Sequence, residues 1–209
     1  MLNHSCAVSG TVVELNAISV DPVFDPMMSA REKMHGREKA EKSFPSYEWQ
    51  RLSLVLNQLQ SGERCLEVGP GRGYLSKAIN QKKLFAQQVA IDIVPAKSPK
   101  SKFGESVDFR EMSIENIEFP DGYFDTIICM EVLEHLDDRA FVSGLNEVRR
   151  VCSRSLIISV PFLEPEPLPS YHKQRFSAER VSATFGGSKF FLMKTPVMRV
   201  PWVLIFESM

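Results

Sequence analysis

The sequence of 209 residues lacks any apolar run of about 18 residues, the length needed for a membrane-spanning helix. It also lacks a signal-peptide pattern, because its first residues contain neither a basic segment nor a sustained apolar core. The four cysteines are scattered without the paired spacing of a zinc site, at Cys6, Cys65, Cys129 and Cys152. These absences predict a protein of the reducing cytoplasm, without a membrane span, a disulfide framework or a zinc site.

An excess of charge of one sign is missing as well. Lysine and arginine number 25 and the acidic residues 26, so the net charge is -1. No overall basic field is therefore available to attract a phosphate backbone, and a nucleic-acid partner is not expected. The composition, 44% hydrophobic and 24% charged, is typical of a globular protein, and the length suffices for one α/β domain.

Two regions differ in pattern. Residues 1–43 are polar, carry mixed charge and show weak periodicity, so we expect an N-terminal appendage that is either a lid or a partly disordered tail. In residues 44–209, short apolar runs alternate with helical patterns. The predicted strands lie at 64–68, 89–93, 107–112, 124–130, 155–160, 190–193 and 202–206, and the clearest helices at 52–59, 75–79, 138–151 and 178–185.

This alternation favours a Rossmann-like, doubly wound α/β fold, in which helices cover both faces of a mostly parallel sheet. Seven strands are predicted. The last two, 190–193 and 202–206, are joined by too few residues for a crossover helix, which predicts an antiparallel hairpin at one sheet edge. No repeat and no clean interdomain linker interrupts the pattern.

A glycine cluster stands between a predicted strand and a predicted helix, in the segment CLEVGPGRGYLS. Gly69, Gly71 and Gly73 allow the backbone to approach a ligand, and the helix beyond presents free N–H groups. A dinucleotide-binding loop reads G-x-G-x-x-G, but here the third glycine comes one residue early. Glu67 precedes the cluster, and a carboxylate there suits an ammonium or a sulfonium better than a pyrophosphate. The segment therefore favours S-adenosylmethionine over NAD.

With these residues in this order, the chain resembles the class I S-adenosylmethionine-dependent methyltransferases. Glu67 and the three glycines match the first motif of that family, and Asp92 matches the acid that ends its second strand and reaches the ribose. Further similar segments are FPDGYFD, EVLEHL and YHKQRFSAERV, so the resemblance covers roughly residues 50–209. Taken one at a time, each element also fits an ordinary tight turn or strand end, whereas the combination indicates cofactor binding.

The resemblance implies that S-adenosyl-L-methionine is the cofactor. The family usually has an aspartate where Ser113 stands here, at the position that contacts the adenine. The implied cofactor-binding residues are Glu67, Gly69, Pro70, Gly71, Gly73, Asp92, Ile93, Ser113, Ile114, Met130 and Glu131. Tyr47 and Trp49 either close over the methionine end of this cofactor or pack in the core.

The acceptor side is predicted less directly. His135 and His172 are the candidate catalytic bases, because an alcohol acceptor benefits from an imidazole within reach, although each histidine can instead serve only to orient a loop. Tyr171 and Arg175 are expected to bind the substrate. Arg175 can hold an acidic group of the acceptor or pair with a glutamate nearby in the sequence, Glu164, Glu166 or Glu179.

A metal site is the main alternative on this side. Glu131, Glu134 and His135 resemble the magnesium-binding E-x-x-E-H segment of small-RNA 3′-end methyltransferases and of some ubiquinone-pathway O-methyltransferases, with His172 as a fourth ligand. EVLEHL also occurs widely without a metal, and the favoured interpretation has none.

The sequence thus predicts methyl transfer by direct displacement to a small or medium-sized acceptor. Candidate acceptors are a saccharide or glycan, a lipid-linked or quinone-type precursor, or another metabolite. The alternatives are a metal-assisted O-methyltransferase and a catalytically silent scaffold with a methyltransferase fold, while the glycine spacing disfavours an NAD-dependent oxidoreductase. Whether the chain forms a homodimer stays open.

Overall fold

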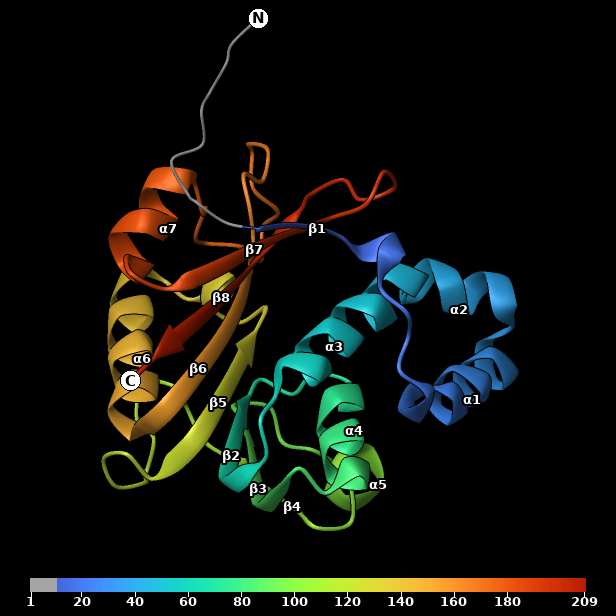
Figure 1. Ribbon diagram of the computed structural model, residues 1–209, viewed down its shortest axis with the longest axis horizontal. Helices are drawn as coiled ribbons and strands as arrows, with labels where there is room; N and C mark the ends of the chain where they lie inside the picture. Colours follow the sequence, from blue (N-terminus) through green and yellow to red (C-terminus); the bar gives the residue numbers. More distant parts are fainter. Residues whose placement is uncertain (1–10) are drawn as a thin grey trace, which may run out of the picture.

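The computed structural model describes residues 11–209 (Figure 1). Residues 1–10, which include Cys6 and the start of the predicted appendage, lie outside the described residues. One sheet runs through the molecule. Its strands are β1 (Thr11–Glu14), β2 (Gly62–Val68), β3 (Phe85–Asp92), β4 (Val107–Glu111), β5 (Phe124–Met130), β6 (Cys152–Pro161), β7 (Lys189–Lys194) and β8 (Trp202–Ser208).

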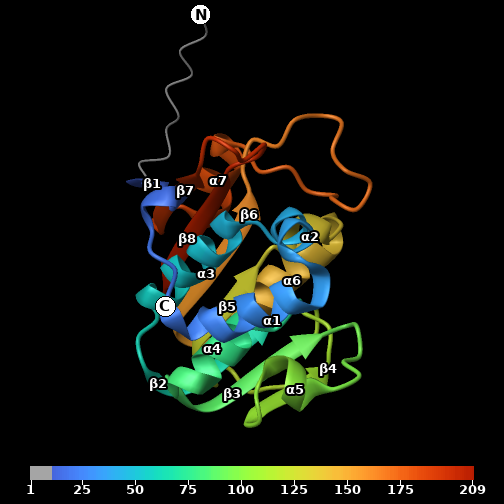
Figure 2. The same cartoon turned by 90° about the vertical axis from the view of Figure 1, so that its right-hand side faces the viewer.

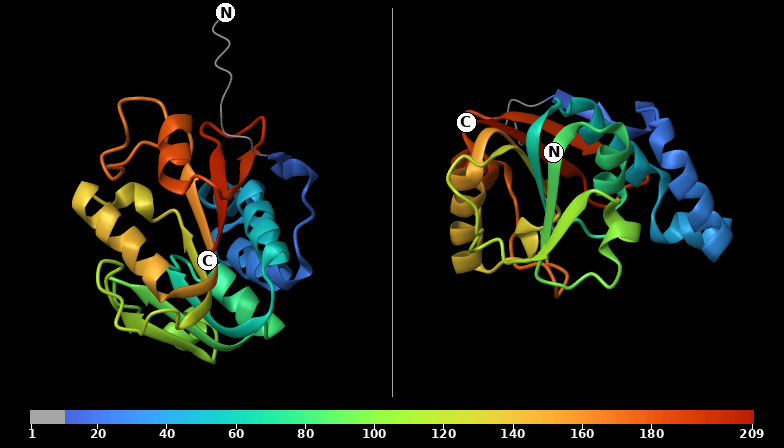
Figure 3. Two further views of the ribbon diagram at one scale, coloured as in Figure 1. Left: turned by 60° about the vertical axis from the view of Figure 1, so that its left-hand side comes forward. Right: turned by 90° about the horizontal axis from the view of Figure 1, so that it is seen from below.

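Helices lie on both faces of this sheet (Figure 3). They are α1 (Asp25–His35), α2 (Arg37–Ser43), α3 (Ser46–Gln58), α4 (Tyr74–Lys82), α5 (Pro99–Phe103), α6 (Asp138–Val151) and α7 (Ala178–Phe185), with short 3-10 turns η1 (Leu15–Ala17), η2 (Pro22–Phe24) and η3 (Leu133–His135). Among residues 11–209, none of these helices is both long and apolar enough to cross a membrane.

The strand order is β1-β7-β8-β6-β5-β2-β3-β4. Only β8 runs against its neighbours β6 and β7, and every other pairing is parallel. The predicted Rossmann-like, doubly wound and mostly parallel fold is therefore confirmed. The order reverses between β2 and β5, and in such sheets the crevice at the carboxyl ends of the strands is where ligands bind.

The prediction of seven strands is wrong by one. β1 pairs in parallel with β7, so the sheet has eight strands and the β7–β8 hairpin does not form its outermost edge. The segment is only four residues long, with most of its side chains exposed, and carries no strand periodicity of its own. It becomes a strand because the free edge of β7 offers hydrogen-bonding partners, which local sequence patterns do not report.

Alternate residues of the central strands supply two cores. Leu66 and Ile127 face the cluster that α6 and α7 complete, whereas Cys65 and Ile128 face the cluster completed by α3 and α4. This is why β5 has a nearly continuous apolar sequence. Cys65, Cys129 and Cys152 are free and buried.

The two helices between β1 and α3 lie outside these layers. Helices α1 and α2 stand beyond α3 and α4, at the outer side of the molecule (Figure 1). Helix α1 buries Met27 and Arg31, and α2 buries Ala40, so both make few apolar contacts with the body. At the same end of the molecule, the loop between β6 and α7 extends outward (Figure 2). These two segments flank the carboxyl ends of the strands.

Candidate active site

The glycine loop turns sharply from β2 into α4. Gly69 has a φ of +63°, and a Cβ built there would lie 2.5 Å from Val132 Cγ2. Gly73 has a φ of +76°, and a Cβ there would collide with the backbone carbonyl oxygen of Lys102. Side chains rarely adopt such dihedral angles, so glycine is required at both positions for conformation as well as for space. The loop can thus bring its backbone directly against a ligand.

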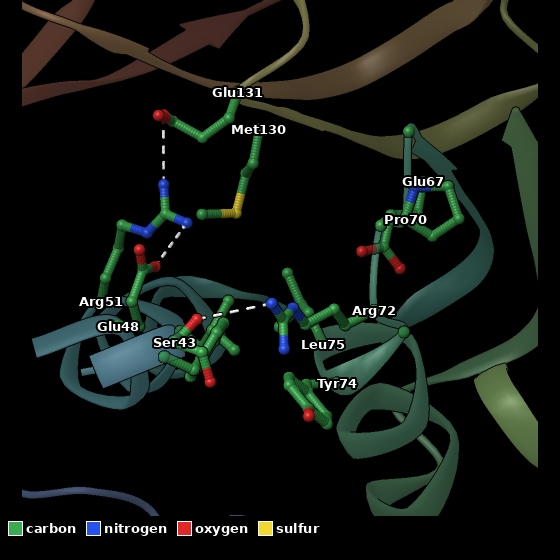
Figure 4. Close-up of a pocket in the computed structure, with 15 residues that line it drawn as sticks. Ser43, Glu48, Arg51, Glu67, Pro70, Arg72, Tyr74, Leu75, Met130 and Glu131 are labelled. Atoms are coloured by element: carbon green, nitrogen blue, oxygen red, sulfur yellow. Dashed lines mark hydrogen bonds and ion pairs between the residues drawn. The ribbon is translucent and has the colours of Figure 1, made fainter. Parts of the chain in front are cut away.

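Two cavities meet at Gly69. The larger has a volume of about 350 Å³ and is bordered by the glycine loop, α3 and the end of β5 (Figure 4). The smaller, about 160 Å³, is bordered by the ends of β3 and β4 and by Val132 and Leu136. Because Gly69 lines both, one elongated ligand that crosses this glycine can fill the two cavities together.

The smaller cavity is a mainly apolar slot. Its walls include Ile91, Ile93 and Ile114, and Asp92 and Ser113 stand at its border. The Asp92 carboxylate accepts the N–H of Val94 at 3.0 Å, and the Ser113 hydroxyl accepts the N–H of Glu115 at 3.2 Å. These bonds fix short turns after β3 and β4. Four predicted cofactor-binding residues, Asp92, Ile93, Ser113 and Ile114, thus line one cavity.

Glu67 lies on the wall of the larger cavity and is only 6% exposed. The Ser76 hydroxyl donates a hydrogen bond to its carboxylate. Burial raises the pKa of Glu67 to about 7, with the Ser76 hydrogen bond acting in the opposite direction. The side chain forms no ion pair within residues 11–209, so a cation entering this cavity would meet an uncompensated carboxylate.

Arg51 of α3 is a residue of this cavity that the sequence analysis missed. It is 8% exposed, donates to Glu48 at 2.8 Å, lies 3.1 Å from the carboxylate of Glu131, and stacks 4.1 Å above the ring of Trp202. Figure 4 shows it facing Met130 across the cavity from the glycine loop. The available signal was an arginine and a glutamate three residues apart on the face of a helix that also carries core leucines.

Glu131 follows β5 in a left-handed conformation, with a φ of +55°. Such a conformation costs a non-glycine residue about 1–3 kcal/mol and persists only where surrounding contacts hold it. Here the backbone N–H donates to the carbonyl of Ser159 at 3.0 Å, and the Ser159 hydroxyl donates to the carboxylate at 2.8 Å. Burial raises the pKa of Glu131, while the nearby guanidinium of Arg51 opposes that shift. Met130 and Glu131, which were predicted to bind the cofactor, line the larger cavity.

A second group of polar side chains lies beside Glu131. Glu134, His135 and His172 each present one ligand atom, and these atoms all lie within 4.8 Å of one another. Glu134 is 1% exposed, and its Oε2 has no hydrogen-bond partner within the described chain. Burial and the neighbouring Glu131 raise the pKa of Glu134 to about 9. The group therefore contains a buried carboxyl of which one oxygen has no hydrogen-bond partner in the described chain.

Both histidine rings in this group are held through Nδ1. His135 Nδ1 lies 2.9 Å from the carbonyl oxygen of Tyr171, and His172 Nδ1 lies 2.7 Å from Glu164 Oε2. The ring centroids of the two histidines are 5.1 Å apart. The structure thus brings the two predicted catalytic histidines together, whereas the carboxylate of Glu131 turns away from them toward Arg51 and Ser159.

The remaining predicted residues lie around this group. Tyr171 is 64% exposed, and its carbonyl holds His135. Arg175 donates from Nε to the backbone carbonyl of Glu164 at 2.9 Å and lies 3.8 Å from the carboxylate of Glu166. Tyr47 and Trp49 lie in the first turn of α3. Trp49 is 3% exposed and packs against Phe44 and Tyr74, so its role is in the core.

A family model described as a methyltransferase domain matches residues 66–157. The matched segment begins in β2 and ends within β6, so it contains the glycine loop, Asp92 and the turn after β5. Together with the strand order and the positions of the motifs, this match supports a class I methyltransferase domain of the S-adenosylmethionine-dependent type, as the sequence resemblance predicted.

The chain is 42% identical over 96 residues to a ubiquinone biosynthesis O-methyltransferase of Xanthomonas euvesicatoria pv. vesicatoria (strain 85-10). That match covers 42% of this chain and 39% of the relative, so the chain spans about two fifths of the relative's length.

Similar folds occur among solved structures. One is the 1,6-didemethyltoxoflavin-N1-methyltransferase of Burkholderia thailandensis, with a TM-score of 0.62 and 16% identity over 87% of this chain and 86% of that one. The cyclase SpnF is similar as well, with a TM-score of 0.55 and 17% identity over 80% of this chain and 69% of that one. The fold therefore serves more than one reaction, and the activity of this chain has to be argued from its site.

Proposed function

We propose that this chain transfers the methyl group of S-adenosylmethionine to a small acceptor by direct displacement. The observation that carries the proposal is the pair of cavities that meet at Gly69, with the buried carboxylate of Glu67 in the larger one and Asp92 at the border of the smaller one. A ligand with a cationic amino-acid end and a nucleoside end matches this arrangement. A dinucleotide would instead place a pyrophosphate beside Glu67, which electrostatic repulsion disfavours.

The charges around the larger cavity suit the methionine end of that ligand. Glu67 accepts its ammonium group, and Arg51 and Arg72 stand on other parts of the wall, where a carboxylate can bind. In the smaller cavity, Asp92 is placed for the ribose hydroxyls and the isoleucine walls for the adenine. These residues bind and align the ligand, and alignment alone can supply several kcal/mol, about 7 or more in well-oriented systems.

The donor supplies a methyl carbon that is already activated by a sulfonium, so the protein needs to orient the acceptor and accept its proton. His135 and His172 lie next to Glu131, which lines the donor cavity, and are the side chains placed to take that proton. Ser43 and Phe44, at the end of the arm formed by α1 and α2, line the same cavity. The arm accordingly serves as a lid over the methionine end.

A phenolic hydroxyl of a quinone-type precursor is the acceptor that we favour. Support comes from the curated relatives, which are named ubiquinone biosynthesis O-methyltransferases, and from imidazoles at the expected acceptor position. Saccharide and lipid-linked acceptors stay predictions, because no contact in residues 11–209 supports them. The homodimer also stays a prediction.

Metal-assisted transfer is a second candidate, because one observation favours it. Glu134, His135 and His172 combine a buried carboxyl that has an unpartnered oxygen with two imidazoles, a donor set that suits a divalent ion. When bound, such an ion would lower the pKa of an acceptor hydroxyl and hold a second oxygen beside it. Glu131 would not belong to this ligand set, since Arg51 and Ser159 occupy its carboxylate.

An acceptor assay tests the proposal. The protein is incubated with S-adenosylmethionine and a panel of phenols with one hydroxyl or two vicinal hydroxyls, and S-adenosylhomocysteine and methylated product are measured by mass spectrometry. We expect stoichiometric formation of both with at least one phenol. A chelator that abolishes turnover, with recovery on adding magnesium, supports the metal-assisted candidate, and unchanged turnover excludes it. Tight donor binding without product from any acceptor class favours the silent scaffold instead.

A further inference from the structure

The loop between β6 and α7 carries a carboxylate–imidazole pair. Glu164 Oε2 lies 2.7 Å from His172 Nδ1, and the two side chains are 10% and 11% exposed. The loop is fixed around this pair: the N–H of Leu163 donates to Phe176, and the N–H of His172 donates to Pro169, each at 2.9 Å. Glu164 is therefore a buried carboxylate whose hydrogen-bond partner is one imidazole nitrogen, and the proposed methyl transfer gives it no role.

The partner at Nδ1 determines which nitrogen of His172 carries the proton. An ionised carboxylate can only accept, so a neutral imidazole bonded to it through Nδ1 has its proton there and its lone pair at Nε2. The same holds for His135, because the Tyr171 carbonyl at its Nδ1 is also only an acceptor. Both rings thus have their lone pair at Nε2, and His135 Nε2 lies 4.0 Å from the carboxylate of Glu134.

We infer that Glu164 is a positioning residue for the acceptor side of the site: through its hydrogen bond to Nδ1, it holds His172 in the tautomer whose Nε2 lone pair binds an electrophile, next to Glu134 and His135. This inference rests on the proposed function for its role in catalysis. The electrophile is either the hydroxyl proton of the acceptor or a divalent cation, and both need the same lone pair.

The surroundings of Glu164 fit this role better than a purely structural one. Arg175, a cation of the same loop, donates to the backbone carbonyl of Glu164, whereas the Glu164 side chain contacts His172. Glu166, two residues further on, is 75% exposed and lies 3.8 Å from Arg175. The same loop therefore contains one glutamate that orients an imidazole and another that does not, which provides a matched control.

The tautomer can be measured directly, without any acceptor or metal. The chain has four histidines, so long-range ¹H–¹⁵N spectra of the imidazoles can be assigned by substitution. We expect His172 to carry its proton on Nδ1 in the wild-type protein, and the Nε2–H form to become populated in Glu164→Gln, whose amide can donate to Nδ1. Glu166→Gln is expected to leave the spectrum unchanged. A His172 with the same tautomer in all three proteins would overturn the inference, whatever the protein methylates.

Kinetics supply the second readout. Loss of such an orienting partner typically costs about 10- to 100-fold, so we expect Glu164→Gln to lower kcat by that factor while the KM for the methyl donor is unchanged. Glu164→Asp, which retains the carboxylate, should recover part of the loss. In a His172→Gln background, Glu164→Gln should cost nothing further, because its effect passes through the ring. Equal additional losses in both backgrounds would contradict the inference.

A magnesium titration distinguishes the two electrophiles. If Nε2 binds a cation, the wild-type protein binds magnesium at least about tenfold more tightly than Glu164→Gln. If neither protein binds magnesium while the kinetic effect is present, Nε2 accepts the hydroxyl proton. Unchanged backbone amide spectra in Glu164→Gln show that the loop remains folded, so that a loss of activity is assigned to the imidazole.

Discussion

At the scale of single residues, Glu67 links stability to donor binding. Its pKa is 4.5 ordinarily and about 7 in the folded protein, because burial penalises the ionised form. A pKa that is higher in the folded state gives a contribution to stability that is fully present below pH 4.5 and is lost as the pH rises to about 7. The carboxyl that suits a cationic ligand therefore destabilises the empty protein at neutral pH.

Urea unfolding of Glu67→Gln tests this cost. The glutamine is neutral at every pH, so the variant should gain on the order of 3 kcal/mol of unfolding free energy relative to wild type between about pH 4.5 and pH 7. Glu63→Gln, which changes an exposed glutamate of the same strand, is the control and should show no such pH-dependent difference. A difference between Glu67→Gln and wild type that is the same at both pH values would contradict the account.

Donor binding should depend on pH in the opposite direction. A cation favours ionised Glu67, so affinity for S-adenosylmethionine is expected to rise as the pH increases toward about 7, by up to about tenfold per pH unit. Binding near pH 6 should release a proton, which calorimetry in buffers of different ionisation enthalpy detects. In Glu67→Gln the affinity is lower and this proton release disappears. Proton release that persists in the variant would assign the linkage to another group.

Some residues of the site could be predicted from the sequence because they follow one another in a short motif. Glu67, the glycines and Asp92 belong to this class, since strand ends and loop lengths determine where they lie. Arg51 was not predicted, because its one signal, a glutamate three residues earlier on the same helix, occurs equally where an arginine faces solvent. The Glu164–His172 contact depends on the path of a proline-rich loop, for which no periodic pattern exists.

At the scale of elements, the turn from β2 into α4 depends on Gly73. Gly73→Ala adds a Cβ in a left-handed conformation, and this Cβ also collides with the carbonyl of Lys102. Gly73 has a φ of +76° and a ψ of +13°, and in this left-handed conformation alone alanine costs about 1–2 kcal/mol. Because of the added collision, we expect Gly73→Ala to cost more than this in urea unfolding and to weaken donor binding. A cost of no more than about 1–2 kcal/mol would contradict the collision.

The arm of α1 and α2 is attached by Arg31, which donates to the Tyr74 hydroxyl at 3.0 Å and also to the Ser43 hydroxyl. Arg31→Met removes both bonds, so amide hydrogen exchange in α1 and α2 should become faster and the donor should dissociate several-fold faster. Arg37→Met, at a side chain that is 88% exposed, is the control and should change neither rate. Faster exchange without faster donor dissociation would exclude the arm as a lid.

The elements themselves were predicted unevenly. Helices α6 and α7 lie where their regular apolar stripes predicted them, and Asp137 and Ser177 cap them. Strand β1 and the short helix α5 were missed. Both are too short to establish a period, and β1 depends on β7, which lies far away in the sequence.

At the scale of the whole molecule, the fold provides a crevice but does not select the reaction. The same architecture occurs in the N1-methyltransferase and in the cyclase SpnF, so the assignment to methyl transfer depends on the charges and shapes around Gly69. The net charge of -1 adds no field of either sign. In the proposed function, specificity for a cationic amino-acid end is therefore a local property of Glu67 and its burial.

Calorimetric titration with S-adenosylhomocysteine, with NAD as the comparison ligand, tests this central claim most directly. Both ligands contain an adenosine, but only the first places an ammonium group near Glu67. The account predicts that S-adenosylhomocysteine binds at a single site, that NAD binds at least about 100-fold more weakly, and that Glu67→Gln loses most of this preference while Glu63→Gln keeps it. Equal affinity for the two ligands, or no binding of S-adenosylhomocysteine by the wild-type protein, would contradict it.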